Sequence, residues 1–122
     1  MKSIERLEDI VIWQKSRSLV KILYSTTYLK SCERDFEYKN QLRGAGISIM
    51  SNIAEGYGRR TNVEFSRFLD ISHGSCEEVK SLLYIGLDLE YLNQEKFDQI
   101  FSLAKEISVM IRKFSNYLRK QK

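Results

Sequence analysis

The chain has 122 residues, a length typical of one domain that buries a core of its own. Its 43% hydrophobic and 30% charged residues are typical of a globular protein in water, and no apolar run approaches the roughly 18 residues of a membrane span. The net charge of +4 permits nucleic-acid binding without requiring it, and the two cysteines form no CxxC pair. The acidic N-terminal sequence does not resemble a signal peptide, so we expect a single cytoplasmic domain over residues 1–122, without membrane contact.

Helical periodicity runs through the sequence, which has no proline and no alternation typical of strands. Four long helical segments with short polar connections predict an all-α fold, an antiparallel up-down four-helix bundle. The expected helices span residues 8–28, 36–57, 62–91 and 94–120.

The first segment carries one apolar stripe, and the second is the most unusual part of the chain. One face of the second is apolar: Leu42, Gly46, Ile49 and Ile53. The opposite side is nearly uncharged and small, with Asn52 at its border: Gly44, Ser48, Ser51 and Glu55. Small residues let another helix approach closely, so this helix is expected to pack on two sides. Gly56 and Gly58 are interpreted as its stop signals.

The third segment begins after a predicted cap at Thr61 or Asn62, and Glu64 fits a capping box if Thr61 is the cap. Beside its core face runs a second, mixed stripe: Ile71, Ser75, Glu78, Leu82 and Leu89. A helix of a monomeric bundle needs only one apolar stripe, so the second predicts a contact between copies of the chain. A thick monomeric core is the alternative.

The fourth segment has the clearest period, in steps of three and four residues typical of a bundle seam. Its seam residues are Phe97, Ile100 or Phe101, Ala104, Ile107, Ile111, Phe114 and Leu118. Asn93 is its predicted cap. The basic residues of the C-terminus, which favour the helix dipole, are Arg112, Lys113, Arg119, Lys120 and Lys122.

Several motifs resemble those of the 23S rRNA-intervening-sequence proteins over nearly the whole length. The first is LEDIVIWQKS at residues 7–16, and the central one is QLR-x-A-x-I-S-I-x-SNIAEG-x-GR at residues 41–59. EF-x-x-FL at 64–69, GS-x-x-E at 74–78 and LDLEYL at 87–92 follow. SNIAEG followed at this distance by EF-x-x-FL is specific, because no general requirement of a bundle produces it.

The resemblance implies a four-helix bundle that assembles into ring-like homopentamers. It implies no enzymatic activity, and it implies RNA or DNA association only as a conjecture, since members are encoded within intervening sequences of bacterial 23S rRNA genes. The family usually has proline where this chain has Met50, and its loss predicts a straighter second helix.

Asn52, Glu55, Ser75 and Glu78 admit two interpretations. In the first, they join Ser48 in a buried polar network, or in a subunit contact, that fixes register. In the second, Glu55 and Glu78 are metal ligands or acid–base groups whose charge is balanced by an arginine. Carboxylate di-metal bundles use Glu-x-x-His pairs, which this sequence lacks.

The single histidine, His73, lies near Cys76 and Glu77, but on a helical wheel Cys76 points inward and the other two outward. No catalytic triad spacing and no phosphate-binding loop occur either. The sequence therefore predicts no catalytic site, no metal and no cofactor.

Two functions from different classes remain. In the first, the oligomer binds RNA or DNA phosphates through Arg43, Arg59, Arg60 and Arg67, and its symmetry multiplies a weak patch. In the second, the oligomer is a protein-interaction scaffold without nucleic-acid binding, and its partner is unknown. Tyr57 lies between two glycines, where it either stacks a base or covers the end of the bundle.

Overall fold

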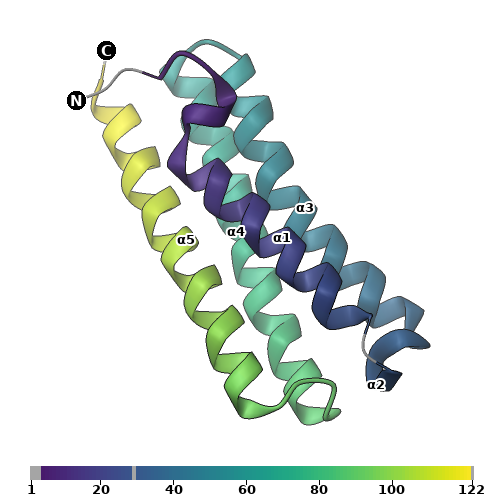
Figure 1. The fold of residues 1–122 in the computed structure, drawn as a ribbon. Coiled ribbons are helices and arrows are strands. Elements are labelled where there is room, and N and C mark those ends of the chain that lie inside the picture. Colours follow the sequence, from purple (N-terminus) through teal and green to yellow (C-terminus); the bar gives the residue numbers. More distant parts are fainter. Residues whose placement is uncertain (1–3, 29, 122) are drawn as a thin grey trace.

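The computed structural model describes residues 4–28 and 30–121, so Lys122 of the basic C-terminus lies outside the described residues. Four long helices run side by side in alternating directions: α1 (Val11–Thr27), α3 (Phe36–Gly58), α4 (Asn62–Asp88) and α5 (Gln94–Lys120) (Figure 1). The short helix α2 (Lys30–Glu33) connects α1 to α3. The described residues contain no strand, and the predicted all-α four-helix bundle is confirmed.

Two helix ends differ from the prediction by three residues, and two others differ by one residue. Helix α1 begins at Val11 because Leu7–Asp9 forms a separate 3-10 turn and Ile10 is extended. Helix α4 ends at Asp88, three residues early, because Glu90 adopts a left-handed φ of 62°. The amides of Tyr91 and Leu92 then donate to the carbonyl of Gly86, which closes the end of the helix.

The predicted caps of the last two long helices are confirmed. The Thr61 hydroxyl accepts a hydrogen bond from the amide of Glu64 at 3.2 Å, so Thr61 rather than Asn62 is the N-cap of α4. Asn93 accepts from the amide of Lys96 at 2.8 Å and starts α5. Each cap satisfies one of the backbone donors that a helix start leaves without an intrahelical partner.

The core lies along the seam between the four long helices. The apolar face predicted for α3 is buried, and Leu42, Ile49 and Ile53 are fully inaccessible. Helix α5 contributes its predicted seam, in which Ile100, rather than the half-buried Phe101, is fully buried. Helix α3 is continuous from Phe36 to Gly58, as expected for a chain with methionine at position 50.

The interpretation of Gly56 as a stop signal is wrong. Gly56 lies inside α3, where an added Cβ would come within 2.8 Å of the Cβ of Phe68 and 2.9 Å of Cδ1 of Phe65. Its small size lets α4 approach α3 closely. Gly58 is the last residue of the helix, and the chain reverses at Arg60, which adopts a left-handed φ of 67°.

Candidate nucleic-acid interface

Two of the predicted arginines lie over one aromatic ring at the end of the bundle where α3 turns into α4. The guanidinium carbon of Arg59 is 5.1 Å from the ring centroid of Phe68, and that of Arg67 is 4.5 Å from it. An arginine stacked on a ring keeps its planar donors in a fixed orientation. Phe68 therefore positions two cations from two helices.

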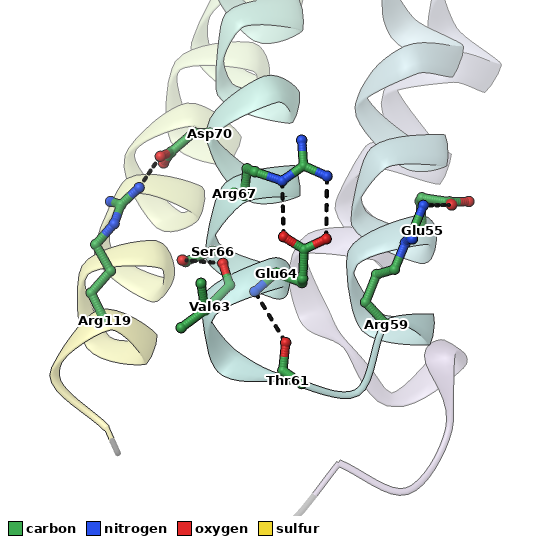
Figure 2. A network of polar contacts seen from close by, with 9 residues as sticks. All are labelled: Glu55, Arg59, Thr61, Val63, Glu64, Ser66, Arg67, Asp70 and Arg119. Carbon is green, nitrogen blue, oxygen red and sulfur yellow. Dashed lines mark hydrogen bonds and ion pairs between the residues drawn. The ribbon is translucent and has the colours of Figure 1, made fainter.

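Both arginines also contact a carboxylate on their own helix, as Figure 2 shows. Arg59 donates to Glu55 at 3.0 Å, and Arg67 donates to both oxygens of Glu64, at 3.0 and 3.3 Å. The hydrogen bond from Arg67 lowers the pKa of Glu64, which keeps this carboxylate charged. The two pairs reduce the local positive charge that a phosphate would meet.

Arg60 differs from its neighbours because its side chain takes part in none of the described ion pairs or hydrogen bonds. It is exposed at the turn between α3 and α4, next to Thr61. The left-handed backbone at this position is uncommon for a residue other than glycine. Arg60 is thus the predicted arginine with the least compensated charge at this end.

The structure does not bring Arg43 to the other three arginines. Its Nε donates to the hydroxyl of Thr27 at 2.8 Å, and its guanidinium carbon lies 4.2 Å from the ring centroid of Tyr24 and 5.0 Å from that of Tyr28. Sixteen residues of helix separate it from Arg59, which is about 24 Å along the axis. Arg43 ties α3 to α1, and the four arginines do not form one patch.

The predicted polar residues between α3 and α4 fall into two groups. The hydroxyls of Ser48 and Ser75 are 2.8 Å apart, and Asn52 donates to the carbonyl of Ser48 at 2.9 Å and to its hydroxyl at 3.1 Å. Glu55 and Glu78 are exposed and do not join these contacts. The structure therefore shows a polar link of three side chains between the two helices.

The described residues hold no cluster of three or more histidine, cysteine or acidic side chains that could bind a metal ion. His73 contacts Arg112, with 3.1 Å between Nδ1 and Nη2, and its Nε2 lies 3.8 Å from Glu77. Cys76 is buried in the core, and this burial raises its pKa to about 12. His73, Cys76 and Glu77 therefore do not converge, as the helical wheel predicts.

An open groove, called here the end groove, lies beside Arg60 and has a volume of about 840 Å³. Four aromatic rings line it: Tyr57, Phe65, Phe114 and Tyr117. The other apolar residues that line it are Ile4, Met110 and Leu118. The remaining lining residues are Gly58, Arg60, Thr61, Asn62 and Lys113.

Sequence reasoning missed the end groove, although it considered Tyr57 for base stacking. Its walls come from the end of α3, the start of α4 and the last turns of α5, which meet at the end of the bundle near both termini (Figure 1). The basic C-terminus was the available signal for Lys113, but the helical period assigned Phe114 to the core seam. Only the fold shows that these residues share one surface.

Comparison with known proteins identifies the family. The model of the 23S rRNA-intervening sequence proteins matches residues 8–113, and the chain belongs to this family. The chain is also similar to the crystal structure of a protein of unknown function from the S23 ribosomal protein family of Bacteroides thetaiotaomicron. That likeness has a TM-score of 0.78 at 24% identity, covers 86% of this chain and 98% of the other, and shows the shared fold alone.

No curated protein matches the chain, and neither similarity indicates an enzymatic family. Among the described helices, none combines the length and the apolar character that crossing a bilayer requires.

Proposed function

We propose that this member of the family is a non-enzymatic homo-oligomer that binds RNA or DNA through the basic surface at the α3–α4 end of the bundle. One observation carries the proposal: the guanidinium groups of Arg59 and Arg67 lie over the ring of Phe68, and the exposed Arg60 follows Arg59 in the chain. Two of these cations lie directly after α3 and one lies on α4, so all three belong to the same end of the bundle. Arg43 is not part of this surface, because it is engaged with α1.

The proposed surface is expected to bind phosphates weakly and without specificity for base sequence. Arginine forms planar, paired hydrogen bonds with phosphate oxygens, and stacking on Phe68 reduces the freedom that binding would remove. Glu55 and Glu64 lie beside two of the three cations and compete for them. Each subunit is therefore expected to bind weakly, and affinity depends on repeating the surface within an oligomer.

A second face supports self-association. Of the mixed stripe predicted for the third segment, Ser75 and Leu82 are buried within the chain, whereas Ile71 and Leu89 are 44% and 53% exposed. Ile85 of α4, at 43% exposure, adds a third exposed apolar side chain. The adjoining face of α3 carries the small residues Gly44 and Ser51. An apolar stripe beside small side chains permits close packing against another copy, and the family resemblance favours a ring-like homopentamer.

Charge reversal tests the nucleic-acid surface. In Arg59→Glu combined with Arg60→Glu, affinity for a structured RNA should fall by at least about tenfold at about 50 mM salt. The native protein should lose about 10³-fold in affinity between about 50 and 200 mM salt if several phosphates are contacted.

The matched control is Lys21→Glu combined with Arg34→Glu, which makes the same change of charge on exposed residues near the opposite end. An equal loss in both double variants would show a general charge effect instead of a surface. If the native protein binds no nucleic acid at either salt concentration, the proposal is wrong and the scaffold function takes its place.

Light scattering coupled to gel filtration tests the oligomer. Ile71→Lys should lower the molar mass toward that of one chain, because a charge would be buried in the contact. Val109→Lys is the control, since Val109 has the same 44% exposure as Ile71 but lies on α5. A native protein that elutes with the mass of one chain would contradict the proposed assembly.

A further inference from the structure

The four rings of the end groove form a continuous series across three helices. The centroids of Tyr57 and Phe65 are 6.2 Å apart, those of Phe65 and Phe114 5.3 Å, and those of Phe114 and Tyr117 6.5 Å. The first two pairs meet edge to face, while Phe114 and Tyr117 lie nearly parallel at 28°. The series begins in the half-buried Tyr57 and ends in Tyr117, which is 46% exposed.

The rim of the end groove is cationic. Arg60 and Lys113 both line it and both are exposed, and no acidic residue is among the described residues that line it. This differs from the neighbouring surface, where Arg59 and Arg67 each have a carboxylate partner within 3.0 Å. An anion entering the end groove would therefore meet two cations without competition from a lining carboxylate.

Aromatic rings beside uncompensated cations match the chemistry of one kind of occupant. Each of the nucleobases has a flat face that stacks on an aromatic side chain, so this contact does not depend on the base sequence. The attached phosphate is attracted to arginine and lysine. A purely apolar ligand would leave Arg60 and Lys113 unused, and a small carboxylate would leave the rings unused. A base within a duplex is already stacked on both faces, so only an unpaired nucleotide offers its face to the rings.

We infer that the end groove binds an unpaired nucleotide of RNA or DNA, with the base on Tyr117 and Phe114 and the phosphate between Arg60 and Lys113. The inference rests on the proposed nucleic-acid function and adds to it a preference for single-stranded segments. The arginines at Phe68 would contact the phosphate backbone of single-stranded and double-stranded nucleic acid alike. The end groove would accept only a base that is not paired with a second strand.

The test compares a single-stranded oligonucleotide with a duplex of the same length and composition, using fluorescence anisotropy at fixed salt. The native protein should bind the single strand more tightly. Tyr117→Ala should weaken single-strand binding by about 5- to 100-fold, the range measured when one base–aromatic stack is removed. Its effect on duplex binding should be far smaller, which should narrow the difference between the two forms.

Two matched controls separate the groove from general surface effects. Tyr84→Ala removes a tyrosine that is 53% exposed but packs on Phe97 and Phe101, away from the end groove. Lys113→Glu is compared with Lys105→Glu, since both are exposed lysines of α5 and only Lys113 lines the groove. Neither control variant should change the preference for single strands, and circular dichroism verifies that each variant is folded.

The outcomes distinguish this inference from the proposed function. If Tyr117→Ala and Lys113→Glu bind single strands as the native protein does, while the double variant at Arg59 and Arg60 loses binding, the groove inference is overturned and the proposed function stands. Equal native affinity for single strand and duplex also overturns the groove inference. Absence of all nucleic-acid binding overturns both.

Discussion

At the end of the bundle where α4 meets α5, tyrosines are tied into the fold by their hydroxyl groups, whereas at the α3–α4 end the rings line an open groove. Tyr38 donates to the carbonyl of Leu82 at 3.0 Å, and Tyr91 donates to Asp35 at 2.6 Å. Their ring centroids lie 5.2 Å apart. In contrast, the hydroxyls of Tyr57 and Tyr117 make no hydrogen bond within the described residues.

The difference shows how one bundle uses similar side chains for stability at one end and leaves them accessible at the other. At the α4–α5 end, Asp35 accepts a hydrogen bond from the hydroxyl of Tyr91. It also caps α3 by accepting one from the amide of Tyr38. Asp35, Tyr38 and Tyr91 therefore each have a hydrogen-bond partner within the fold. At the α3–α4 end, the exposed tyrosine and the two rim cations have donors and ring faces left for a ligand.

The largest expected effect comes from filling the space beside Tyr38. In Gly86→Ala, the new Cβ would clash with the Tyr38 hydroxyl oxygen and lie 3.1 Å from Cδ1 of Leu92. The tyrosine cannot shift without losing its bond to Leu82, so we expect a loss of about 1–3 kcal/mol in unfolding free energy. Urea denaturation measures the change.

Gly74→Ala is the matched control on the same helix, because an added Cβ there meets nothing within 4 Å. It should stabilise the protein by up to about 1 kcal/mol through helix propensity. If the two variants shifted stability in the same direction, tight packing at the tyrosine end would not be the cause.

Tyr38→Phe removes one hydroxyl and keeps the ring. The buried bond to Leu82 is then lost, and we expect a fall of about 1 kcal/mol in unfolding free energy. Tyr84→Phe is the comparison: because Tyr84 is exposed, removing its hydroxyl should leave the unfolding free energy almost unchanged. Equal stability of the Tyr38 variant and the native protein in urea would show that the hydroxyl adds nothing to this end.

The sequence predicted the helices and their buried faces because both depend on local periodicity. Thr61 and Asn93 were predicted as caps for the same reason: a cap bonds to an amide three residues away. Gly56 was misinterpreted because glycine serves both at helix ends and at close helix contacts, and only the position of Phe68 distinguishes the two.

The end groove and the placement of Arg43 depended on contacts between distant segments. Tyr57 and Phe114 come from helices that are far apart in the sequence, and a helical wheel orders each residue only within its own helix. Arg43 was grouped with Arg59 because both were placed around the end of the second predicted helix, but a helical wheel does not show that Thr27 of α1 contacts Arg43. Motif resemblance identified the family without showing either feature.

Tyr91→Phe should lower the stability of the fold by an amount that depends on pH. The hydrogen bond from Tyr91 lowers the pKa of Asp35 below its ordinary value of 3.8, and the bond to Asp35 raises the pKa of Tyr91 to about 12. A lowered acid pKa stabilises the fold above about pH 4, and this contribution disappears as the pH falls through the folded-state value. The raised tyrosine pKa stabilises below about pH 10, and this contribution disappears as the pH rises toward 12.

The Tm of Tyr91→Phe should therefore be lower than that of the native protein at about pH 7, and the two should converge toward about pH 2. Because both groups are solvent-accessible, the effect should be smaller than that of Gly86→Ala. A Tm difference that stays constant down to about pH 2 would indicate lost packing instead of the lost bond to Asp35.

The smallest effect on stability is expected at the α3–α4 end itself. Tyr117→Phe removes a hydroxyl that has no described partner from a side chain that is 46% exposed, so unfolding free energy should change by less than about 0.5 kcal/mol. Removing the hydroxyl of Tyr38 should cost more than removing that of Tyr117. Urea denaturation of the two variants side by side measures that order. If Tyr117→Phe proved the more destabilising, its hydroxyl would be part of the fold at this end, and the contrast between a closed and an accessible end would fail.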